Sequence, residues 1–160
     1  MLRNEPIHRI PRKGLTVWRL YGMISTITAI ILAGVIGFLT YRFQWPTLIY
    51  YLMICLIIIL AILSILVLPA IRWEHWRYDV REHEIEIQSG LFVVKRTMIP
   101  MVRVQHVDSA QGPILKKYNL ANISISTAAT THTIPMLISE DADLMRKRIS
   151  ELARVAEDDV

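Results

Sequence analysis

The sequence predicts an α+β membrane protein in which a two-helix transmembrane hairpin precedes a bent antiparallel β-sheet or barrel capped by a C-terminal helix. Three observations favour this class. Arg42 is the only charged residue between Leu20 and Ile71. After Arg72, apolar and polar residues alternate at the spacing of β-strands. The final segment returns to helical spacing, with its apolar residues on one face.

Charge is distributed unevenly along the 160 residues. The whole chain carries a net charge of +4, and the basic arm of residues 1–19 accounts for +4, with five basic residues against Glu5. Residues 72–160 hold 12 basic and 13 acidic side chains. A nucleic-acid-binding protein would carry a basic face on its folded part, so this distribution argues against nucleic acid as a partner. A basic arm beside anionic headgroups gains about 1 kcal/mol per residue.

Two stretches are long and apolar enough to cross a bilayer, and together they form a hairpin over 20–71. The first span covers 20–41 and the second covers 47–71. About 20 helical residues cross the ~30 Å hydrocarbon layer. A cleaved signal peptide is the alternative for the first span. It fits poorly, because the apolar region is too long and a second span follows almost at once.

The orientation of the hairpin follows from the basic residues that flank it. The connection over 42–46 is too short for a domain and holds Arg42 alone, whereas the arm holds five basic residues. Three arginines follow the second span within a short distance: Arg72, Arg77 and Arg81. Because basic residues accumulate on the inner side of a membrane, both termini are expected in the cytoplasm.

Small residues recur at every fourth position of the first span, at Ser25, Ala29, Ala33 and Gly37. Small side chains allow close approach of helix backbones, which drives helix packing in lipid. The stripe predicts packing against the second span, contact with another membrane protein, or both. Within the spans we find no carboxylate, so the sequence does not favour an ion or proton path through this chain.

The region 72–156 is expected to form one cytoplasmic domain, followed by an acidic tail over 157–160. Alternating β-branched and aromatic residues predict six strands. These are 74–80, 84–89, 91–99, 102–108, 121–127 and 131–137. Residues 114–119 favour a helical turn, and 139–155 favour the C-terminal helix, with Ser139 as its N-cap.

Several segments resemble the membrane-bound bacterial pleckstrin-homology (PH) domain family, and the whole chain is similar to its small two-span YdbS-type members. The resemblance covers residues 15–158. Its most specific parts are Pro100–Asp108, Gln111-Gly112-Pro113, Lys116–Leu120, Ile125–Thr130 and Ile134-Pro135.

The resemblance implies a PH-like fold, a bacterial cytoplasmic membrane, and a hetero-complex with a larger membrane protein that holds several similar domains. It also implies a connection with envelope stress and with tolerance of membrane-active antimicrobials. A PH fold has seven strands, one more than the pattern predicts. The missing strand is expected either near 110–120 or merged with the exit from the second span.

Polar residues of two strands and one turn form the predicted binding surface. It comprises Arg103, Gln105, His106, Lys116, Lys117, Thr130 and His132. Strict alternation would place Arg103 and Gln105 opposite Val102 and Val104. Each of these segments also fits a purely structural interpretation, as a solvated strand face, a hairpin or a solvated turn.

The residue pattern does not predict an enzyme, a metal site or a cofactor. The histidines lack the spacing of paired metal ligands, and Cys55 is the single cysteine. Neither a nucleophile motif nor a phosphate-binding glycine pattern is present in the sequence. We therefore expect a tethered binding or assembly module whose partners are the bilayer and a second membrane protein. A homo-oligomer is the other assembly considered, and a lipid-headgroup sensor that uses Lys116 and Lys117 is the alternative function.

Overall fold

The computed structural model describes residues 6–91 and 93–158, with side chains as far as Ala156. The chain forms two compact units. One unit comprises Trp18–Ile71, and the other brings Met1–Val17 together with Arg72–Val160. The arm before the first span therefore belongs to the same unit as the domain after the second span. This differs from the expected division, in which the arm was separate.

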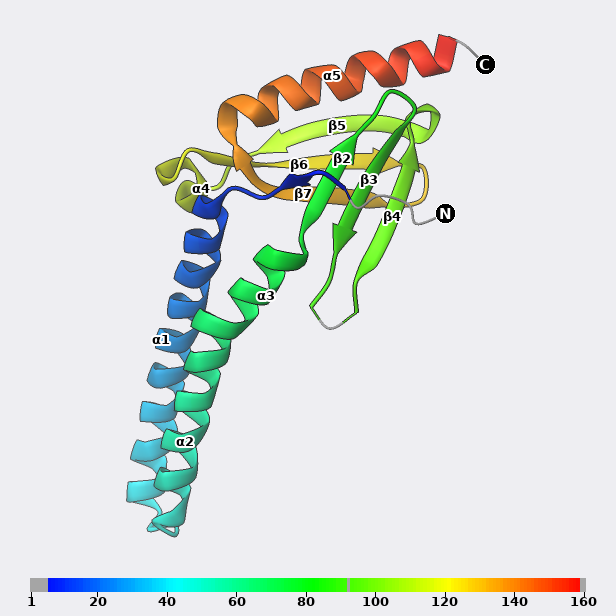
Figure 1. Ribbon diagram of the computed structural model, residues 1–160. Helices are drawn as coiled ribbons and strands as arrows, with labels where there is room; N and C mark the ends of the chain where they lie inside the picture. The colour runs from blue at the N-terminus through cyan, green and yellow to red at the C-terminus, as the bar shows by residue number, and fades with distance from the viewer. Residues whose placement is uncertain (1–5, 92, 159–160) are drawn as a thin grey trace. The chain divides into compact units, whose positions relative to one another are not determined.

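The helical unit consists of two long antiparallel helical segments (Figure 1). Helix α1 covers Arg12–Arg42. The second segment is α2 (Leu48–Ile62), a π-helical stretch (Leu63–Val67) and α3 (Leu68–His75). Both segments are long and apolar enough to cross a membrane, and only 6% of the most apolar window of each is buried. So much exposed apolar surface is unfavourable in water but favourable in the hydrocarbon layer of a membrane.

The two spans approach each other closely at Gly22. A Cβ atom on Gly22 would lie 2.2 Å from the carbonyl oxygen of Ser64, so only glycine fits at this position. One turn further on, the hydroxyl groups of Thr26 and Ser64 share a hydrogen bond of 3.2 Å. Towards the connection, the Tyr50 hydroxyl donates to the carbonyl of Gly37 at 3.0 Å. Small residues on α1 therefore allow close contact between the helices.

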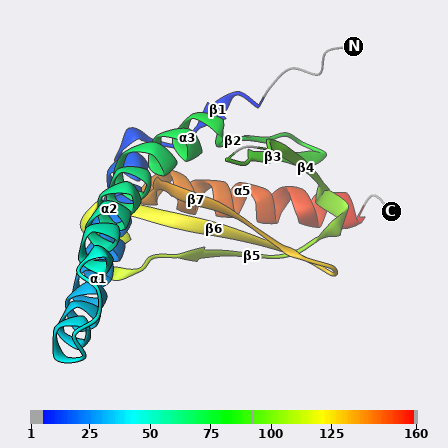
Figure 2. The ribbon, with the colours of Figure 1, turned by 90° about the horizontal axis from the view of Figure 1, so that it is seen from below.

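The other unit contains two antiparallel sheets (Figures 1 and 2). The first sheet has the order β1 (His8–Arg9), β2 (Arg77–Val80), β3 (Glu84–Ser89) and β4 (Lys95–Pro100). A 3-10 turn at Met101–Arg103 leads to the second sheet, β5 (Val104–Ala110), β6 (Leu120–Thr127) and β7 (Thr131–Ile138). Helix α4 (Pro113–Lys117) joins β5 to β6, and α5 (Ser139–Asp158) follows β7.

The core of this unit lies between the sheets and α5. Figure 2 shows α5 in the space where the two sheets diverge. Ile85 and Ile123 are fully buried on the sheets, and Ile149 is fully buried on the apolar face of α5. These side chains belong to one hydrophobic cluster. The predicted α+β class with a C-terminal cap is confirmed, and the arrangement is that of a PH-like fold.

The seventh strand comes from neither of the two expected places. It is β1, which lies in the arm before the first span, where His8 pairs with Tyr78 and Arg9 pairs with Arg77. The two expected locations were wrong: residues 113–117 form α4, and the exit from the second span is helical to His75. An isolated two-residue strand has no period of its own, so alternation does not reveal it.

Several other boundaries also differ from the sequence prediction by a few residues; the strand expected over 102–108, for example, is β5 (Val104–Ala110). Strand β4 begins at Lys95 rather than at residue 91, because Gly90 has a φ of +155° and starts a turn. Helix α5 continues to Asp158, beyond the expected start of an acidic tail at residue 157, and the last two residues of that tail lie outside the described part.

Candidate functional site

The predicted binding residues partly converge on one open cavity, which we call the corner cavity. It has a volume of about 500 Å³ and lies where β4 turns into β5, beside the β6–β7 hairpin. Met98, Pro100 and Val102 contribute apolar surface. Four predicted polar residues line it together: Arg103, Gln105, Thr130 and His132.

A 3-10 turn before β5 and a bulge within β5 place Arg103 and Gln105 at the corner cavity. Val104 pairs with Thr127 and His106 pairs with Ser126, so Gln105 is an extra residue in the ladder. Strict alternation over this segment was therefore wrong. Arg103 belongs to the 3-10 turn, and Val102 is half exposed beside it and lines the same cavity. A bulge bends a strand and re-aims its side chains.

The β6–β7 hairpin orients the other two residues, Thr130 and His132. The Thr127 hydroxyl donates to the carbonyl of Thr130 at 2.9 Å, and the Thr130 amide donates back to that hydroxyl at 3.2 Å. The Thr130 hydroxyl and Nε2 of His132 share a hydrogen bond of 2.9 Å. The turn thus fixes the position of the imidazole ring, as hydroxyl-containing turns commonly do.

The corner cavity combines hydrogen-bond donors with an apolar surface. Arg103 provides a permanent cation, Gln105 an amide, and the Thr130–His132 pair a hydroxyl and an imidazole. Of the described residues that line the cavity, none is acidic. Such a site can bind a carboxylate or carbonyl group whose apolar part lies on Met98 and Val102.

The other predicted binding residues lie elsewhere. His106 is exposed on the outer face of β5, and its Nε2 is 2.9 Å from a carboxylate oxygen of Asp108. Lys116 and Lys117 are exposed in the last turn of α4.

The small residues predicted to pack in the first span differ in exposure: Ala29, Ala33 and Gly37 are partly buried, whereas Ser25 is exposed.

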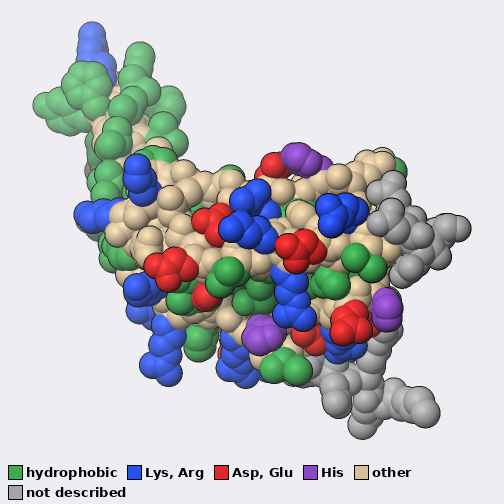
Figure 3. Space-filling view, turned by 90° about the horizontal axis from the view of Figure 1, so that it is seen from above, with side chains coloured by type: hydrophobic (Ala, Val, Ile, Leu, Met, Phe, Trp, Pro, Cys, Tyr) green, Lys and Arg blue, Asp and Glu red, His purple; other side chains and the backbone are tan. Residues whose placement is uncertain are grey.

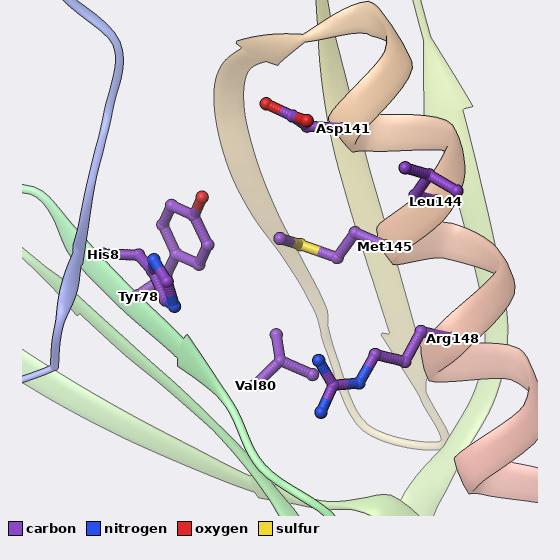
Figure 4. Close-up of a pocket in the computed structure, with 7 residues that line it drawn as sticks. All are labelled: His8, Tyr78, Val80, Asp141, Leu144, Met145 and Arg148. Carbon is purple, nitrogen blue, oxygen red and sulfur yellow. The ribbon is translucent and has the colours of Figure 1, made fainter.

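Sequence reasoning missed a second cavity, of about 370 Å³, which is lined by β1, β2 and α5 (Figure 4). The rings of His8 and Tyr78 stack at 5.5 Å, and Asp141, Met145 and Arg148 project from α5. Burial, and to a lesser extent the charge of Asp141, raises the pKa of Tyr78 above its ordinary value. The sequence alone does not indicate this cavity, because it does not show that His8 belongs to this domain.

An ion-pair network covers the outer face of the first sheet. Nε of Arg81 donates to Asp79 at 2.9 Å, and its two terminal nitrogens lie 3.3 Å from Glu84 and 3.5 Å from the buried Glu86. The hydrogen bond to Asp79 is the main cause of the raised pKa of Arg81.

On the face formed by α5, basic and acidic side chains are interspersed (Figure 3), so that face lacks the uniform charge typical of nucleic-acid binding.

Metal chemistry has no support in the described residues. Within residues 6–91 and 93–158, histidine, cysteine and acidic side chains do not gather in a group that could hold a metal ion.

Comparison with known proteins identifies the family. The family model described as "Bacterial PH domain" matches residues 15–153. The chain is 48% identical over 159 residues to UPF0699 transmembrane protein YdbS of Bacillus subtilis, an alignment that covers 99% of this chain and 100% of the relative. It is 28% identical over 81 residues to UPF0699 transmembrane protein YdbT of the same bacterium, which covers 51% of this chain and 16% of that protein. No solved structure gives a significant match.

The comparisons agree with the architecture, which combines two apolar helices with two antiparallel sheets and a C-terminal helix. The chain belongs to the bacterial PH-domain family and is a UPF0699-type membrane protein similar to YdbS along its whole length.

Proposed function

We propose that this protein is a non-catalytic, membrane-tethered binding module of the bacterial cytoplasmic membrane. In this proposal it is one subunit of a hetero-complex, and its partner is a larger membrane protein with similar PH-like domains. The corner cavity is the contact site. It binds a carboxylate or backbone carbonyl group of the partner together with an adjacent apolar side chain.

The convergence of polar residues on the corner cavity carries the proposal. Arg103, Gln105 and His132 come from a turn, a bulge and a hairpin, and all three line the same opening. They combine a cation and neutral donors with an apolar floor, which matches the polar anchors and apolar surface of protein-binding sites. The domain is tethered to a membrane, so a partner in the same membrane meets it at high effective concentration.

The similarity to YdbT supports a partner of the same family. YdbT and YdbS occur in one bacterium, and this chain aligns with both. The alignment covers 16% of YdbT, so that relative is much longer than this chain. A larger membrane protein with a domain of this type is therefore the partner that we propose.

The pairing of the arm with β2 supports a common side for both ends of the hairpin. Arg9 pairs with Arg77, and these residues precede the first span and follow the second span. A strand can pair only with a strand on its own side of the membrane. The basic flanks favour the cytoplasm as that side.

Purification from native membranes in mild detergent tests the assembly. We expect a second PH-type membrane protein to co-elute with the wild-type chain. Arg103→Glu should reduce its recovery about tenfold or more, since a repelled charge in an interface costs several kcal/mol. Lys116→Glu is the matched control, because it reverses an exposed charge outside the corner cavity. Recovery of this chain alone, or equal losses with both variants, would contradict the proposal.

The proposed physiological role is in the response to envelope stress. If the complex supports tolerance of membrane-active antimicrobials, cells without this protein should be more sensitive to them. The Arg103→Glu variant should fail to restore tolerance although it accumulates normally, whereas the Lys116→Glu variant should restore it.

A further inference from the structure

One end of the first sheet carries basic residues on three of its four strands. Residue pairing aligns Arg9 with Arg77, Arg77 with Gln88, and Gln88 with Arg96. Paired residues of antiparallel strands project from the same face of a sheet, so the three arginines form a row on the outer face. Arg9 and Arg77 lie directly opposite each other, which concentrates positive charge at this end of the sheet.

The next outward-facing row of the same sheet is acidic. It contains Asp79 paired with Glu86, and both side chains are buried by neighbouring groups. The Arg96 guanidinium is tied to this part of the sheet, since its Nε donates to Gln88 at 2.8 Å and another nitrogen lies 4.0 Å from Glu86. Positive charge is thus concentrated towards one end of the sheet, where Arg9 and Lys95 are exposed.

An apolar tip projects beyond the same end. In the loop between β3 and β4, Val93 is 81% exposed and Val94 is 44% exposed, directly before Lys95. Gly90 holds the loop in this shape, because its φ is +155° and a Cβ atom there would lie 2.0 Å from the carbonyl oxygen of Val93. An exposed apolar tip beside cations is typical of surfaces that enter the headgroup region of a membrane.

The chain also passes to and from the apolar helices at this end of the sheet. After Arg9, the arm continues within three residues into α1, and β2 begins at Arg77, directly after α3 and Trp76. The register places Ser89 and Lys95 beyond the Arg77–Gln88 pair, so the tip lies at the end where β2 starts. The turn at residues 81–83 lies at the opposite end.

We propose that this end of the first sheet docks on the bilayer. In this arrangement Val93 and Val94 enter the headgroup region, while the exposed Arg9 and Lys95 bind the phosphate groups of anionic lipids. This surface is distinct from the corner cavity and from Lys116 and Lys117. It would orient the domain towards the membrane whether or not a protein partner is bound.

A site-specific fluorophore tests the docking in the full chain. Cys55→Ser removes the single cysteine, and Val93→Cys then places an environment-sensitive dye on the tip. His83→Cys, in the exposed turn at the other end of the same sheet, is the matched control. In vesicles that contain phosphatidylglycerol, we expect the dye at position 93 to shift to the blue. We also expect headgroup nitroxide lipids to quench it several-fold more strongly than the dye at position 83.

The charge dependence separates specific docking from general attraction. Arg9→Gln and Lys95→Gln should each lower the ratio of docked to undocked domains about fivefold, which corresponds to the ~1 kcal/mol that one basic residue gains near an anionic membrane. Lys116→Gln and Lys117→Gln remove the same charge elsewhere and should leave the ratio unchanged.

Three results would overturn the proposal. Equal quenching at positions 93 and 83 would show that the tip does not meet lipid. A blue shift at position 93 without quenching by nitroxide lipids would show that the tip packs against protein. Equal effects of the two pairs of glutamine variants would show that charge acts without a defined surface. None of these results would bear on partner binding at the corner cavity.

Discussion

The side-chain oxygen of Asn122 accepts a hydrogen bond from the backbone amide of Met136 at 2.9 Å. Met136 has a φ of +56°, which is uncommon for a residue other than glycine, and it lies where the pairing of β6 with β7 shifts by one residue. The bulge removes the regular backbone partner of this amide, and Asn122 replaces it. The bulged strand then presents the Met136 side chain to Gly14 in the first turn of α1.

Loss of the Asn122 side chain should destabilise the domain. Asn122→Ala leaves the partly buried amide of Met136 without its acceptor, and we expect the free energy of unfolding to fall by about 1–2 kcal/mol. Asn122→Asp retains an acceptor and should lose less. Thermal unfolding in detergent, followed by tryptophan fluorescence, should show a drop in Tm of roughly 5 °C or more for the alanine variant. Equal Tm values for the alanine and aspartate variants would contradict this role.

The contact between Gly14 and Met136 predicts a graded response to side-chain size. A Cβ atom on Gly14 would lie 3.1 Å from Cβ of Met136 and 2.8 Å from a methyl group of Ile10. Gly14→Ala gains helix propensity of up to about 1 kcal/mol, which this crowding should offset. Gly14→Leu should lower stability by about 1–3 kcal/mol through overpacking. Protease protection of the arm in the purified chain would measure its docking, and an unchanged arm in the leucine variant would argue against it.

The main elements were predictable because their sequence signals are local. Leu20–Ile71 contains one charged residue, which predicts the hairpin, and the alternation in Glu84–Gln88 predicts β3. The apolar face of α5 was equally visible in its 3.6-residue period. Each of these signals lies within the element that it describes.

The arm strand and the cavity residues depend on contacts that are distant in sequence. His8 and Arg9 become a strand only because β2, which follows both spans in the sequence, pairs with them. The bulge at Gln105 arises from pairing with β6, and Val102 lies in the 3-10 turn before β5, so strict alternation over this segment was wrong. Of the predicted binding surface, the residues that flank one corner converge, whereas His106 and the α4 lysines do not, because sequence spacing does not report how a sheet bends.

The close approach at Gly22 predicts that this glycine maintains the hairpin. A larger residue would push Ser64 away, because even a Cβ atom would lie 2.2 Å from its carbonyl oxygen. Thr26→Cys and Ser64→Cys in a Cys55→Ser background should cross-link on oxidation in membranes, since the native hydroxyl groups are 3.2 Å apart. Gly22→Leu should abolish the cross-link. Gly34→Leu should leave it intact, because a Cβ atom on Gly34 meets nothing within 4 Å.

The buried phenol of Tyr78 predicts a loss of stability at alkaline pH. Burial first, and then the charge of Asp141, raises its pKa in the folded state, so the folded domain favours the neutral form. This stabilisation is fully present below the unfolded pKa of about 10 and is lost as the pH rises through the higher folded pKa. In that window, stability should fall with pH because of this residue, by at most about 1.4 kcal/mol per pH unit. Tyr78→Phe keeps the ring beside His8 but cannot ionise, so its unfolding free energy should decline less steeply with pH. Denaturant titrations on both sides of pH ~10 would measure the two slopes, and equal slopes would exclude this role for Tyr78.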